Sequence, residues 1–526
     1  MKRSVCLYGR RASGLICLLG IVFLSACASV PEAGSYDRPV THTLTDTEDT
    51  ALARTIGRAF PEQLAAGEES GFYPLDDGMK AFVARMALVD VAEVSVDVQY
   101  YIWHPDTSGT LLAGKLLDAA DRGVRVRLLL DDLDTAGKDT FLVQLDAHPN
   151  IEVRLYNPFA YRGSRGVGFA GDLKRLNHRM HNKSLTVDNQ AAIVGGRNIG
   201  NEYFDAVAHT AFADLDVLAI GPVVPRVSGM FDQYWNSEVA VPVGVVVTGV
   251  DISPSNLAEA RGNFQARIDS AWQSDYVKAV QASKVLDELR FANLGIAWGR
   301  AQLLYDDPEK LLHPEITGET HLAPQLLPVV AGASQRVAVV SPYFVPGEAT
   351  VELFRELVAR GVEVSILTNS LAANDVGVVH AGYMRYRKAL LEGGVHLYEY
   401  KPEPTQVSRN KNWTGSSSAS LHAKTLGADG RHVFVGSFNL DPRSVALNTE
   451  MGVMIENPVL ASGLHEGFHR LARNQAYRVE LVDGQLRWTE ILAGGELRTY
   501  DVEPQTTLWQ RFVARTLSII VPESML

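Results

Sequence analysis

Two short stretches of the chain carry residue types that could do nucleophilic and acid–base chemistry. The first, HNKSLTVDNQAAIVGGRN (181–198), contains His181 and Lys183, then Asp188 in a polar turn, and ends at Asn198. Its alternation around the turn predicts strand, tight turn, strand. His181 and Lys183 are two apart, so in an extended segment they would share a face. Taken alone, the stretch fits an incidental half-exposed hairpin equally well.

A second copy makes coincidence a poor explanation. Residues 422–439, HAKTLGADGRHVFVGSFN, repeat the order with His422, Lys424, Asp429 and Asn439. The interval from histidine to asparagine is seventeen residues in both stretches, 198 minus 181 and 439 minus 422. Glycine or Gly-Ser precedes the asparagine in each case. We therefore interpret the pair as two half-sites of one functional site.

The repeat extends beyond these stretches to the elements that must position them. Residues 94–132 predict strand, helix, strand with Gly123 near the helix end, and residues 336–369 predict the same order. A further strand follows in each half, at 151–158 and 394–402, before the motif. The sequence therefore predicts an α/β fold made of two duplicated domains, with one half-site in each.

Two facing half-sites would bring together two imidazoles, two ammonium groups and two amides. One imidazole could attack phosphorus to form a covalent phosphohistidine, while the other protonates the leaving oxygen. The lysines and asparagines, Lys183, Lys424, Asn198 and Asn439, would hold the non-bridging oxygens. This chemistry requires no cofactor and no metal, and no His/Asp/Glu group shows convincing metal-ligand spacing in the sequence.

The paired motifs resemble those of the phospholipase D superfamily, from about residue 75 to the C-terminus. The stretches DVQYYIWHPDTSG, HAGYMRYRKALLEGGVHLYEY and GSFNLDPRSVALNTE bring the chain closest to bacterial cardiolipin synthases of the C type. The resemblance implies two α/β/α sandwich domains related by pseudo-twofold symmetry, with one active site at their interface. It also implies that His181 is the nucleophile and His422 the general acid/base, with the opposite assignment left open.

The same resemblance implies that a downstream carboxylate orients each histidine. Alignment of ADLDVLAIGPV with TEMGVMIENPV places Asp214 opposite Glu450, and Asp216 is a close competitor. The motif aspartates, Asp188 and Asp429, are expected to brace the hairpins as in Asx turns and not to touch substrate.

Two arginines beside the asparagines have no settled role. Arg197 and Arg443 are candidate phosphate ligands, and surface ion pairs explain them equally well. The segment 162–179 is basic and glycine-rich in an otherwise acidic chain of net charge −12, so it could receive an anionic head group, or it is a solvated loop.

The N-terminus predicts export and lipidation. Basic residues precede a short apolar run at 15–24, and LSAC ends at Cys27, which resembles a bacterial lipoprotein signal. An ordinary cleaved signal peptide is the alternative. Loss of residues 1–26 removes four positive charges and leaves about −16, which argues against a nucleic-acid partner. The expected location is the periplasmic side of the cell envelope, and Ala28-Ser29 favours the outer membrane.

The predicted organisation has six parts. These are a signal peptide (1–26), a flexible tether (27–50), a first phospholipase D-like domain (51–270), a connecting segment (271–325), a second such domain (326–475) and a C-terminal extension (476–526). The last twenty residues, 507–526, gather apolar residues near one helical face. That pattern suits an interfacial helix or one packed on the core, and we favour packing.

The leading functional hypothesis is a phosphatidyltransferase that makes cardiolipin, with phosphatidylglycerol as acceptor and a phospholipid, such as phosphatidylethanolamine, as donor. A hydrolytic phospholipase D would use the same residues and deliver water in the second step. A nuclease is disfavoured by the acidic charge, and a non-catalytic lipid-binding module by the two complete half-sites. The sequence indicates no protein partner.

Overall fold

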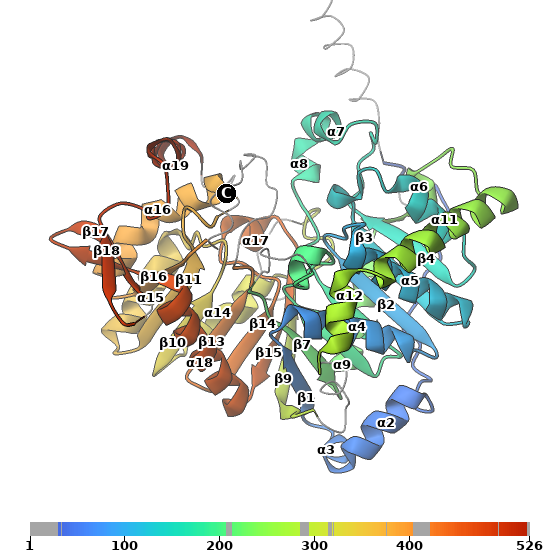
Figure 1. The fold of residues 1–526 in the computed structure, drawn as a ribbon, viewed down its shortest axis with the longest axis horizontal. Helices are drawn as coiled ribbons and strands as arrows, with labels where there is room; N and C mark the ends of the chain where they lie inside the picture. Colours follow the sequence, from blue (N-terminus) through green and yellow to red (C-terminus); the bar gives the residue numbers. More distant parts are fainter. Residues whose placement is uncertain are drawn as a thin grey trace, which may run out of the picture.

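The computed structural model describes residues 30–32, 34–206, 213–284, 294–313, 318, 320–374, 376–402, 421–492 and 494–522. Figure 1 shows the first half of the chain on the right and the second half on the left. Cys27 and the predicted signal peptide lie outside the described residues. Among the helices of the described ranges, none has both the length and the apolar character needed to cross a bilayer.

The first half is built on one mixed sheet. Its order is β9-β1-β7-β6-β5-β2-β3-β4-β8, in which β2, β3 and β4 run parallel and the other pairs are antiparallel. The strands are β1 (Ser70–Leu75), β2 (Ser95–Tyr100), β3 (Arg125–Asp131), β4 (Ile151–Tyr156), β5 (Ser184–Val187), β6 (Ala191–Gly195), β7 (Asp216–Ile220) and β8 (Ala240–Pro242).

The second half repeats that order. Its sheet runs β9-β15-β14-β13-β10-β11-β12-β16-β17-β18, again with a parallel trio, β10 to β12, at the centre. The strands are β9 (Ala297–Tyr305), β10 (Arg336–Val340), β11 (Glu363–Asn369), β12 (His396–Tyr400), β13 (Thr425–Ala428), β14 (His432–Gly436), β15 (Met451–Glu456), β16 (Ala476–Val482), β17 (Gln485–Ile491) and β18 (Leu497–Tyr500). The predicted duplicated α/β fold is confirmed.

Helices cover both faces of each sheet. In the first half, one face of the sheet forms an apolar core with α4, α5 and α6, and α9 packs on the opposite face. In the second half, α14, α15 and α16 cover the face that corresponds to the first of these, and α18 covers the opposite face. The bounds are α2 (Ala51–Ala59), α3 (Pro61–Ala66), α4 (Gly78–Asp90), α5 (Thr107–Asp121), η1 (Asp132–Thr135), α6 (Asp139–Asp146), α7 (Arg165–Gly171), α8 (Leu173–Leu176), η2 (Asn201–Tyr203), α9 (Val223–Asn236), α10 (Val243–Val246), α11 (Pro254–Trp272), α12 (Asp275–Ala282), α14 (Leu322–Ala331), α15 (Gly347–Ala359), α16 (Gly377–Glu392), α17 (Pro442–Ala446), α18 (Pro458–Gln475) and α19 (Leu508–Ile520).

One strand belongs to both sheets. Residues 297–299 of β9 pair with β1, and residues 300–305 pair with β15. An apolar cluster that includes Val194 of β6 and Val435 of β14 then fills the space between the halves. The predicted connecting segment therefore contains a structural strand, and β16 of the predicted C-terminal extension completes the second sheet. The domain boundaries stay predictions, since no comparison tests them.

The two motifs form the expected hairpins with one difference. The strands begin at Ser184 and Thr425, so the histidine and lysine of each motif precede the strand. Asp188 lies in the turn with φ of 49°, and its carboxylate accepts the backbone N–H groups of Val94 and Ser95 at 2.8 and 2.9 Å. These partners lie in the segment that enters β2, so the brace is long-range and is not the local Asx turn that we expected.

The described part of the predicted tether is not free. Thr43 donates its backbone N–H to the carboxylate of Asp232, and the amide of Asn236 donates to the carbonyl of Thr41. Asp232 and Asn236 are both residues of α9. The buried guanidinium of Arg127 also donates to the Thr41 carbonyl at 3.0 Å. The expectation of a flexible tether is therefore wrong for this stretch, because its backbone satisfies polar groups of the first half.

We predict that removal of the first turn carboxylate destabilises the protein more than removal of the second. In Asp188→Ala, buried N–H groups at the start of β2 lose their acceptor, which should lower the free energy of unfolding by on the order of 3 kcal/mol. Asp429 braces Ser334 and Gln335, which are exposed and can turn to water. Asp429→Ala should therefore cost clearly less.

Urea unfolding of the two variants measures this difference. Asp188→Asn, which keeps one acceptor oxygen, should fall between Asp188→Ala and the parent chain. Equal losses for Asp188→Ala and Asp429→Ala would contradict the assignment of the larger brace to the buried site.

Candidate active site

The backbones of the two halves join at the motifs. His181 donates its N–H to the carbonyl of Thr449, and Thr449 donates to the carbonyl of Arg179. The same arrangement recurs on the other side, where the N–H of His422 donates to the carbonyl of Ala213 at 2.9 Å. The backbone of each histidine is thus hydrogen-bonded to the residue that directly precedes the candidate carboxylate of the other half.

This pairing exchanges the carboxylates between the halves. The Nδ1 of His181 lies 3.0 Å from Glu450 Oε2, and the Nδ1 of His422 lies 2.6 Å from Asp214 Oδ2. The competitor Asp216 faces elsewhere, because its buried carboxylate pairs with Arg85 and Arg197. The alignment therefore selected the two carboxylates that contact the histidines, but it gave no indication that each would contact the histidine of the opposite half.

The protonation of the imidazoles follows from these contacts. Burial raises the pKa of the Asp214 and Glu450 carboxyls, but the paired histidines and nearby lysines outweigh it and leave each pKa below its usual value. The ionised carboxylates can only accept, so each Nδ1 carries a proton and each Nε2 keeps its lone pair. Burial is also the largest cause that lowers the pKa of His181 to about 4 and that of His422 to about 3.

The lysines place positive charge beside both imidazoles. The ammonium groups of Lys183 and Lys424 are buried, and each donates to the backbone carbonyl of the histidine in its own motif. Burial lowers the pKa of Lys183 to about 7. Lys424 contributes to the lowered pKa of His181, and Lys183 to that of His422, so the half-sites lie within electrostatic reach of each other.

The asparagines are held differently in the two halves. Asn198 donates from Nδ2 to the hydroxyl of Tyr203 at 3.1 Å and accepts the N–H of Ile102. The Oδ1 of Asn439 is buried and has no hydrogen-bond partner among the described residues. Both amides are buried, as are the motif lysines, and an amide of this kind can receive a phosphate oxygen.

The small residues before the asparagines explain the GG and GS variants of the motif. A Cβ at Gly196 would lie 2.3 Å from Asp214 Oδ1, so no side chain fits there. The equivalent Ser437 instead donates its hydroxyl to Glu450 Oε2 at 2.5 Å, and Ser444 donates to Oε1 at 2.8 Å. Glu450 thus shares its charge with two hydroxyls, and Asp214 has no such hydroxyl donor among the residues that the structure describes.

Two tyrosines that the sequence analysis did not select lie against the histidines. The ring of Tyr101 meets His181 edge to face with centroids 4.8 Å apart, and Tyr203 meets His422 in the same way at 5.3 Å. Tyr203 lies five residues after Asn198, so nearness to a motif in sequence was a signal for it, whereas Tyr101 is far from both motifs and lies in the stretch DVQYYIWHPDTSG that carried the family resemblance. These rings exclude water from one side of each imidazole.

The connecting segment supports the loop that carries Glu450. Asp306 accepts the N–H of Glu450 at 2.8 Å and pairs with Lys310 at 3.1 Å. Lys310 also donates to the carbonyls of Ser444 and Asn448. Burial raises the pKa of Asp306 to about 7. This buried brace was not visible in the sequence.

The arginines expected to be phosphate ligands have partners within the protein. All the N–H groups of the buried Arg197 guanidinium point at protein acceptors, which are the carbonyls of Leu75, Asp76, Tyr203 and Asp214 and the Asp216 carboxylate. It therefore braces the loop and has no donor left for phosphate. Arg443 donates to Asn177 through both NH groups, which links the two halves.

The basic segment 162–179 is also neutralised internally. Arg162 and Arg165 pair with Asp132, and Arg179 pairs with Asp131. Arg175 pairs with Asp172 within the segment. These arginines hold α7 and α8 on the first domain, so the expectation of a basic loop ready for a head group does not match the structure.

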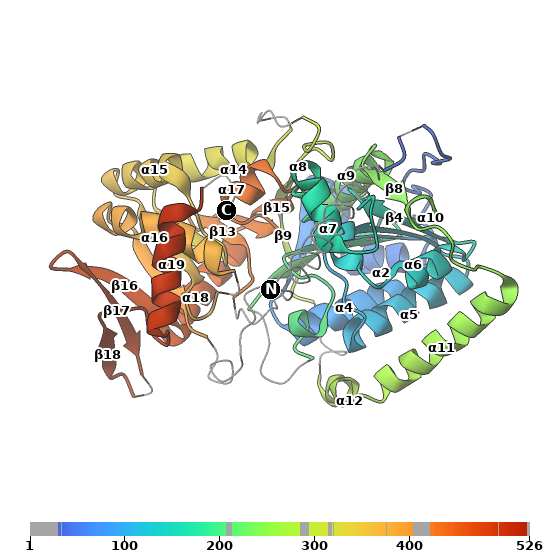
Figure 2. The ribbon, with the colours of Figure 1, turned by 90° about the horizontal axis from the view of Figure 1, so that it is seen from above.

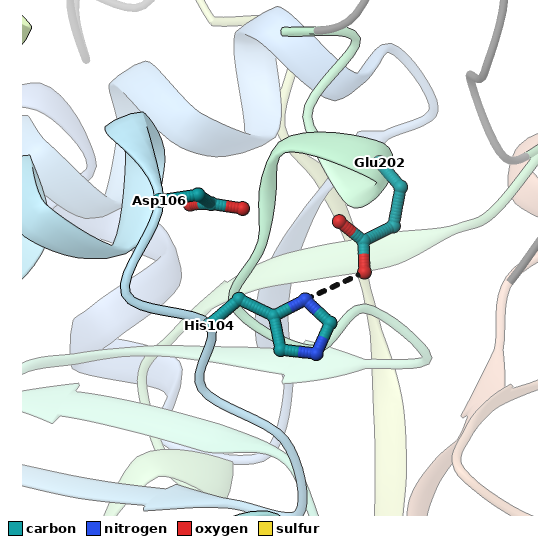
Figure 3. Close-up of side chains that lie close together, drawn as sticks. All are labelled: His104, Asp106 and Glu202. Atoms are coloured by element: carbon teal, nitrogen blue, oxygen red, sulfur yellow. Dashed lines mark ion pairs between the residues drawn. The ribbon is translucent and has the colours of Figure 1, made fainter. Parts of the chain in front are cut away.

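Figure 3 shows a cluster that spacing alone did not reveal. Ligand atoms of His104, Asp106 and Glu202 lie within 4.8 Å of one another, and His104 Nδ1 is 2.9 Å from Glu202. Asp106 caps α5 and accepts the N–H of Asn201, so its oxygens already have protein partners. The hydrogen bond with Glu202 raises the pKa of His104. The cluster ties the loop after Asn198 to the start of α5.

Comparison with known proteins agrees with this geometry. The family described as "Cardiolipin synthase, PLD-like domain" matches residues 86–235 and 326–472. Cardiolipin synthase C of Escherichia coli (strain K12) is 45% identical over 468 residues, which cover 87% of this chain and 96% of that protein. An uncharacterized protein of Helicobacter pylori (strain ATCC 700392 / 26695) is 33% identical over 473 residues, or 89% and 92% of the two chains.

A solved structure resembles the whole arrangement. Phosphatidylserine synthase of Haemophilus influenzae Rd KW20 superposes with a TM-score of 0.55 and 15% sequence identity, covering 86% of this chain and 95% of that one. At this identity the likeness concerns the fold. Together with the two matched segments and the relatives, it shows that the chain belongs to the family of cardiolipin synthase, PLD-like domains and thus to the phospholipase D superfamily.

Proposed function

We propose that this protein is a phosphatidyltransferase that joins two phospholipids into cardiolipin through a covalent phosphohistidine. The observation that carries the proposal is the pair of buried imidazoles, each oriented by the carboxylate of the other half and flanked by a motif lysine. The identity of 45% to cardiolipin synthase C supports the choice of reaction. The proposed substrates are phosphatidylglycerol and a second phospholipid.

In the first step, the Nε2 of His181 attacks phosphorus of the donor lipid. A phosphorus–nitrogen bond forms, and the bond from phosphorus to the leaving oxygen breaks. His422, charged at that moment, donates its Nε2 proton to the leaving oxygen. The ammonium groups of Lys183 and Lys424, with the amides of the asparagines, stabilise charge on the non-bridging oxygens.

In the second step, the now neutral His422 takes the proton from a hydroxyl of phosphatidylglycerol. The resulting oxygen attacks phosphorus and displaces the Nε2 of His181, which restores the enzyme. A bound phosphodiester is anionic, so it counters the lysine charges that lower both histidine pKa values and eases protonation of His422 before the first step.

The unequal carboxylates support this division of roles. Asp214 makes the shorter bond to its histidine, 2.6 Å, so its charge can stabilise the His422 imidazolium that the first step needs. Glu450 divides its charge among His181, Ser437 and Ser444, which suits an imidazole that must stay neutral to attack. In the ligand-free protein, burial and Lys424 hold the pKa of His422 below that of His181, so in this assignment the bound phosphodiester has to supply the shift that charges His422.

Hydrolytic phospholipase D remains the second candidate, because it shares the first step. Water would then replace the lipid hydroxyl, and the product would be phosphatidic acid. The identity of 45% to cardiolipin synthase C supports a lipid acceptor over water.

The proposed location is the periplasmic side of the bacterial envelope, with a lipid anchor on Cys27 and the outer membrane favoured. The support is the sequence pattern LSAC followed by Ala28-Ser29, without the aspartate that favours the inner membrane. Radiolabelled palmitate should mark the parent chain and not Cys27→Ser; label retained by the variant would remove the anchor from the proposal.

The product spectrum tests the proposed function. We expect the purified chain to convert labelled phosphatidylglycerol, with phosphatidylethanolamine as donor, mainly into cardiolipin. The expectation rests on the 45% identity to cardiolipin synthase C. Thin-layer chromatography separates the products. Phosphatidic acid as the main product would favour the hydrolase, and digestion of DNA would favour a nuclease.

The two histidines should have separable effects. His181→Ala cannot form the phosphoenzyme and should lose essentially all turnover. His422→Ala lacks the general acid, so turnover of natural lipid should fall about 10²–10⁴-fold. With a p-nitrophenyl phosphodiester, which needs little acid, His422→Ala should still release a burst of nitrophenol and trap the adduct. Mass spectrometry should find that adduct on His181; an adduct on His422 in His181→Ala would reverse the roles.

Anion binding should weaken as pH rises through about 7, because Lys183 loses its proton there. Sulfate keeps its charge over this range, so titration calorimetry from pH 6 to 9 reads the protein alone. Its affinity should fall by up to about tenfold per pH unit above 7. Lys183→Arg stays charged and should flatten the profile. A flat profile for the parent chain would show that Lys183 remains a cation throughout.

A further inference from the structure

Helix α19 (Leu508–Ile520) presents large apolar side chains to solvent. Leu508, Trp509, Phe512 and Ile519 are 81%, 67%, 60% and 84% exposed. They lie within about one third of the helix circumference, given 100° per residue. Trp509 and Phe512 stack with centroids 5.7 Å apart. Such a concentration on one helix differs from the scattered apolar residues of an ordinary surface.

The helix is fixed in this orientation by its opposite face. Ala514 is buried against the second domain, and Arg385 of α16 donates to the carbonyls of Ser518 and Val521. Just before the helix, Glu503 pairs with the buried Arg387 of α16 at 3.4 Å. A capping box at Thr507 starts the helix. The packing predicted from the sequence is therefore real, but it uses the small and polar residues and leaves the large apolar ones outside.

The charge of α19 differs from that of the chain. Its sequence, LWQRFVARTLSII, contains Arg511 and Arg515 and no acidic residue, although the whole chain has a net charge of −12. Arg515 is exposed beside the apolar face. Tryptophan and phenylalanine flanked by arginine is the composition that partitions into the head-group region of anionic lipid.

The helix shares a side of the molecule with segments that lie next to both motifs in the chain. Figure 1 places α19, α7 and α8 at the top of the molecule, and in Figure 2, which looks onto that side, α17 lies between α19 and α8. Segment α8 ends five residues before His181, and α17 begins three residues after Asn439. Leu173 and Lys174 of α8 are exposed there. A planar surface touching α19 and α8 would thus face the segments that carry both motifs.

We infer that α19 is an interfacial helix that seats the enzyme on an anionic phospholipid bilayer, with its apolar face among the acyl chains and Arg515 at the phosphates. This role rests on the proposed function, because it orients the site toward lipid substrates. It is independent of the N-terminal anchor, which tethers the chain without fixing which side meets the membrane.

Tryptophan quenching tests the contact without relying on activity. The full chain is reconstituted into vesicles of phosphatidylglycerol and phosphatidylethanolamine that carry brominated acyl chains. Bromine should quench part of the emission, and that part should be missing from Trp509→Phe. Equal quenching of the two proteins would place Trp509 outside the bilayer and overturn the inference.

Paired activity assays separate this inference from the proposed function. Phe512→Asp should reduce turnover of lipid in vesicles about tenfold or more, since a charge must then enter the interface. Turnover of the same lipid in detergent micelles should stay within about twofold. Val459→Asp is the matched control, because Val459 is 73% exposed and belongs to α18, which Figure 1 draws at the lower side of the molecule, and it should change neither rate.

Each other outcome has a distinct meaning. Equal loss by Phe512→Asp in vesicles and micelles would assign α19 a purely structural role. A parent chain that dimerises through α19, shown by a change to monomer in Phe512→Asp without any quenching difference, would make the face a contact between copies. Absence of product from the parent chain in micelles would reject the proposed function while the quenching result still decides the inference.

Discussion

The hydrogen bonds between each histidine and the carboxylate of the opposite half are the constraint on which the site depends. Neither half can orient its own imidazole, because Glu450 serves His181 and Asp214 serves His422. The backbone N–H groups of the two histidines donate to Thr449 and Ala213, the residues directly before these carboxylates, so these hydrogen bonds also join opposite halves. A chain with a single half would therefore present an imidazole without a partner, which is a physical reason for the duplication.

The buried charged groups of the site are matched, so that each positive charge is offset by a negative one. Two ammonium groups face two carboxylates, and the imidazoles are neutral in the ligand-free protein. Burial of such charges is costly unless each has partners with good geometry. The carboxylates are satisfied by hydroxyl, imidazole and backbone donors, while the ammonium groups are directed by backbone carbonyls. A phosphodiester adds the negative charge that the two lysines can still accommodate.

Elements outside the motifs keep this arrangement rigid. The strand β9 pairs with both sheets, and Asp306 directly after it holds the backbone of Glu450. Arg197 satisfies its donors on the loop that carries Asp214, and Arg443 ties α17 to Asn177. In this protein, buried cations outside the catalytic pair serve as braces. The lysines and asparagines of the motifs therefore stay the proposed phosphate ligands.

Much of this protein could be predicted from its sequence because the relevant signals are local. The repeat of βαβ units, the hairpins and the equal spacing of His181 and His422 reflect periodicity and turn chemistry, which neighbouring residues determine. The alignment on Pro-Val also selected Asp214 and Glu450. The C-terminal helix was visible in the same way, as an apolar period between residues 507 and 526.

The tertiary structure alone decided which groups meet. The exchange of carboxylates depends on two segments more than two hundred residues apart, and no local pattern encodes that distance. Asp216, Arg197 and the arginines of 162–179 looked like site residues, but they form ion pairs within the protein, most of them with residues of other elements. Likewise, the apolar periodicity of residues 507–526 did not determine which face of α19 packs against the core. The burial of Ala514 and the hydrogen bond from Arg385 to the end of the helix fix the packed face. Packing favours the face that fits its neighbour over a face that is only apolar.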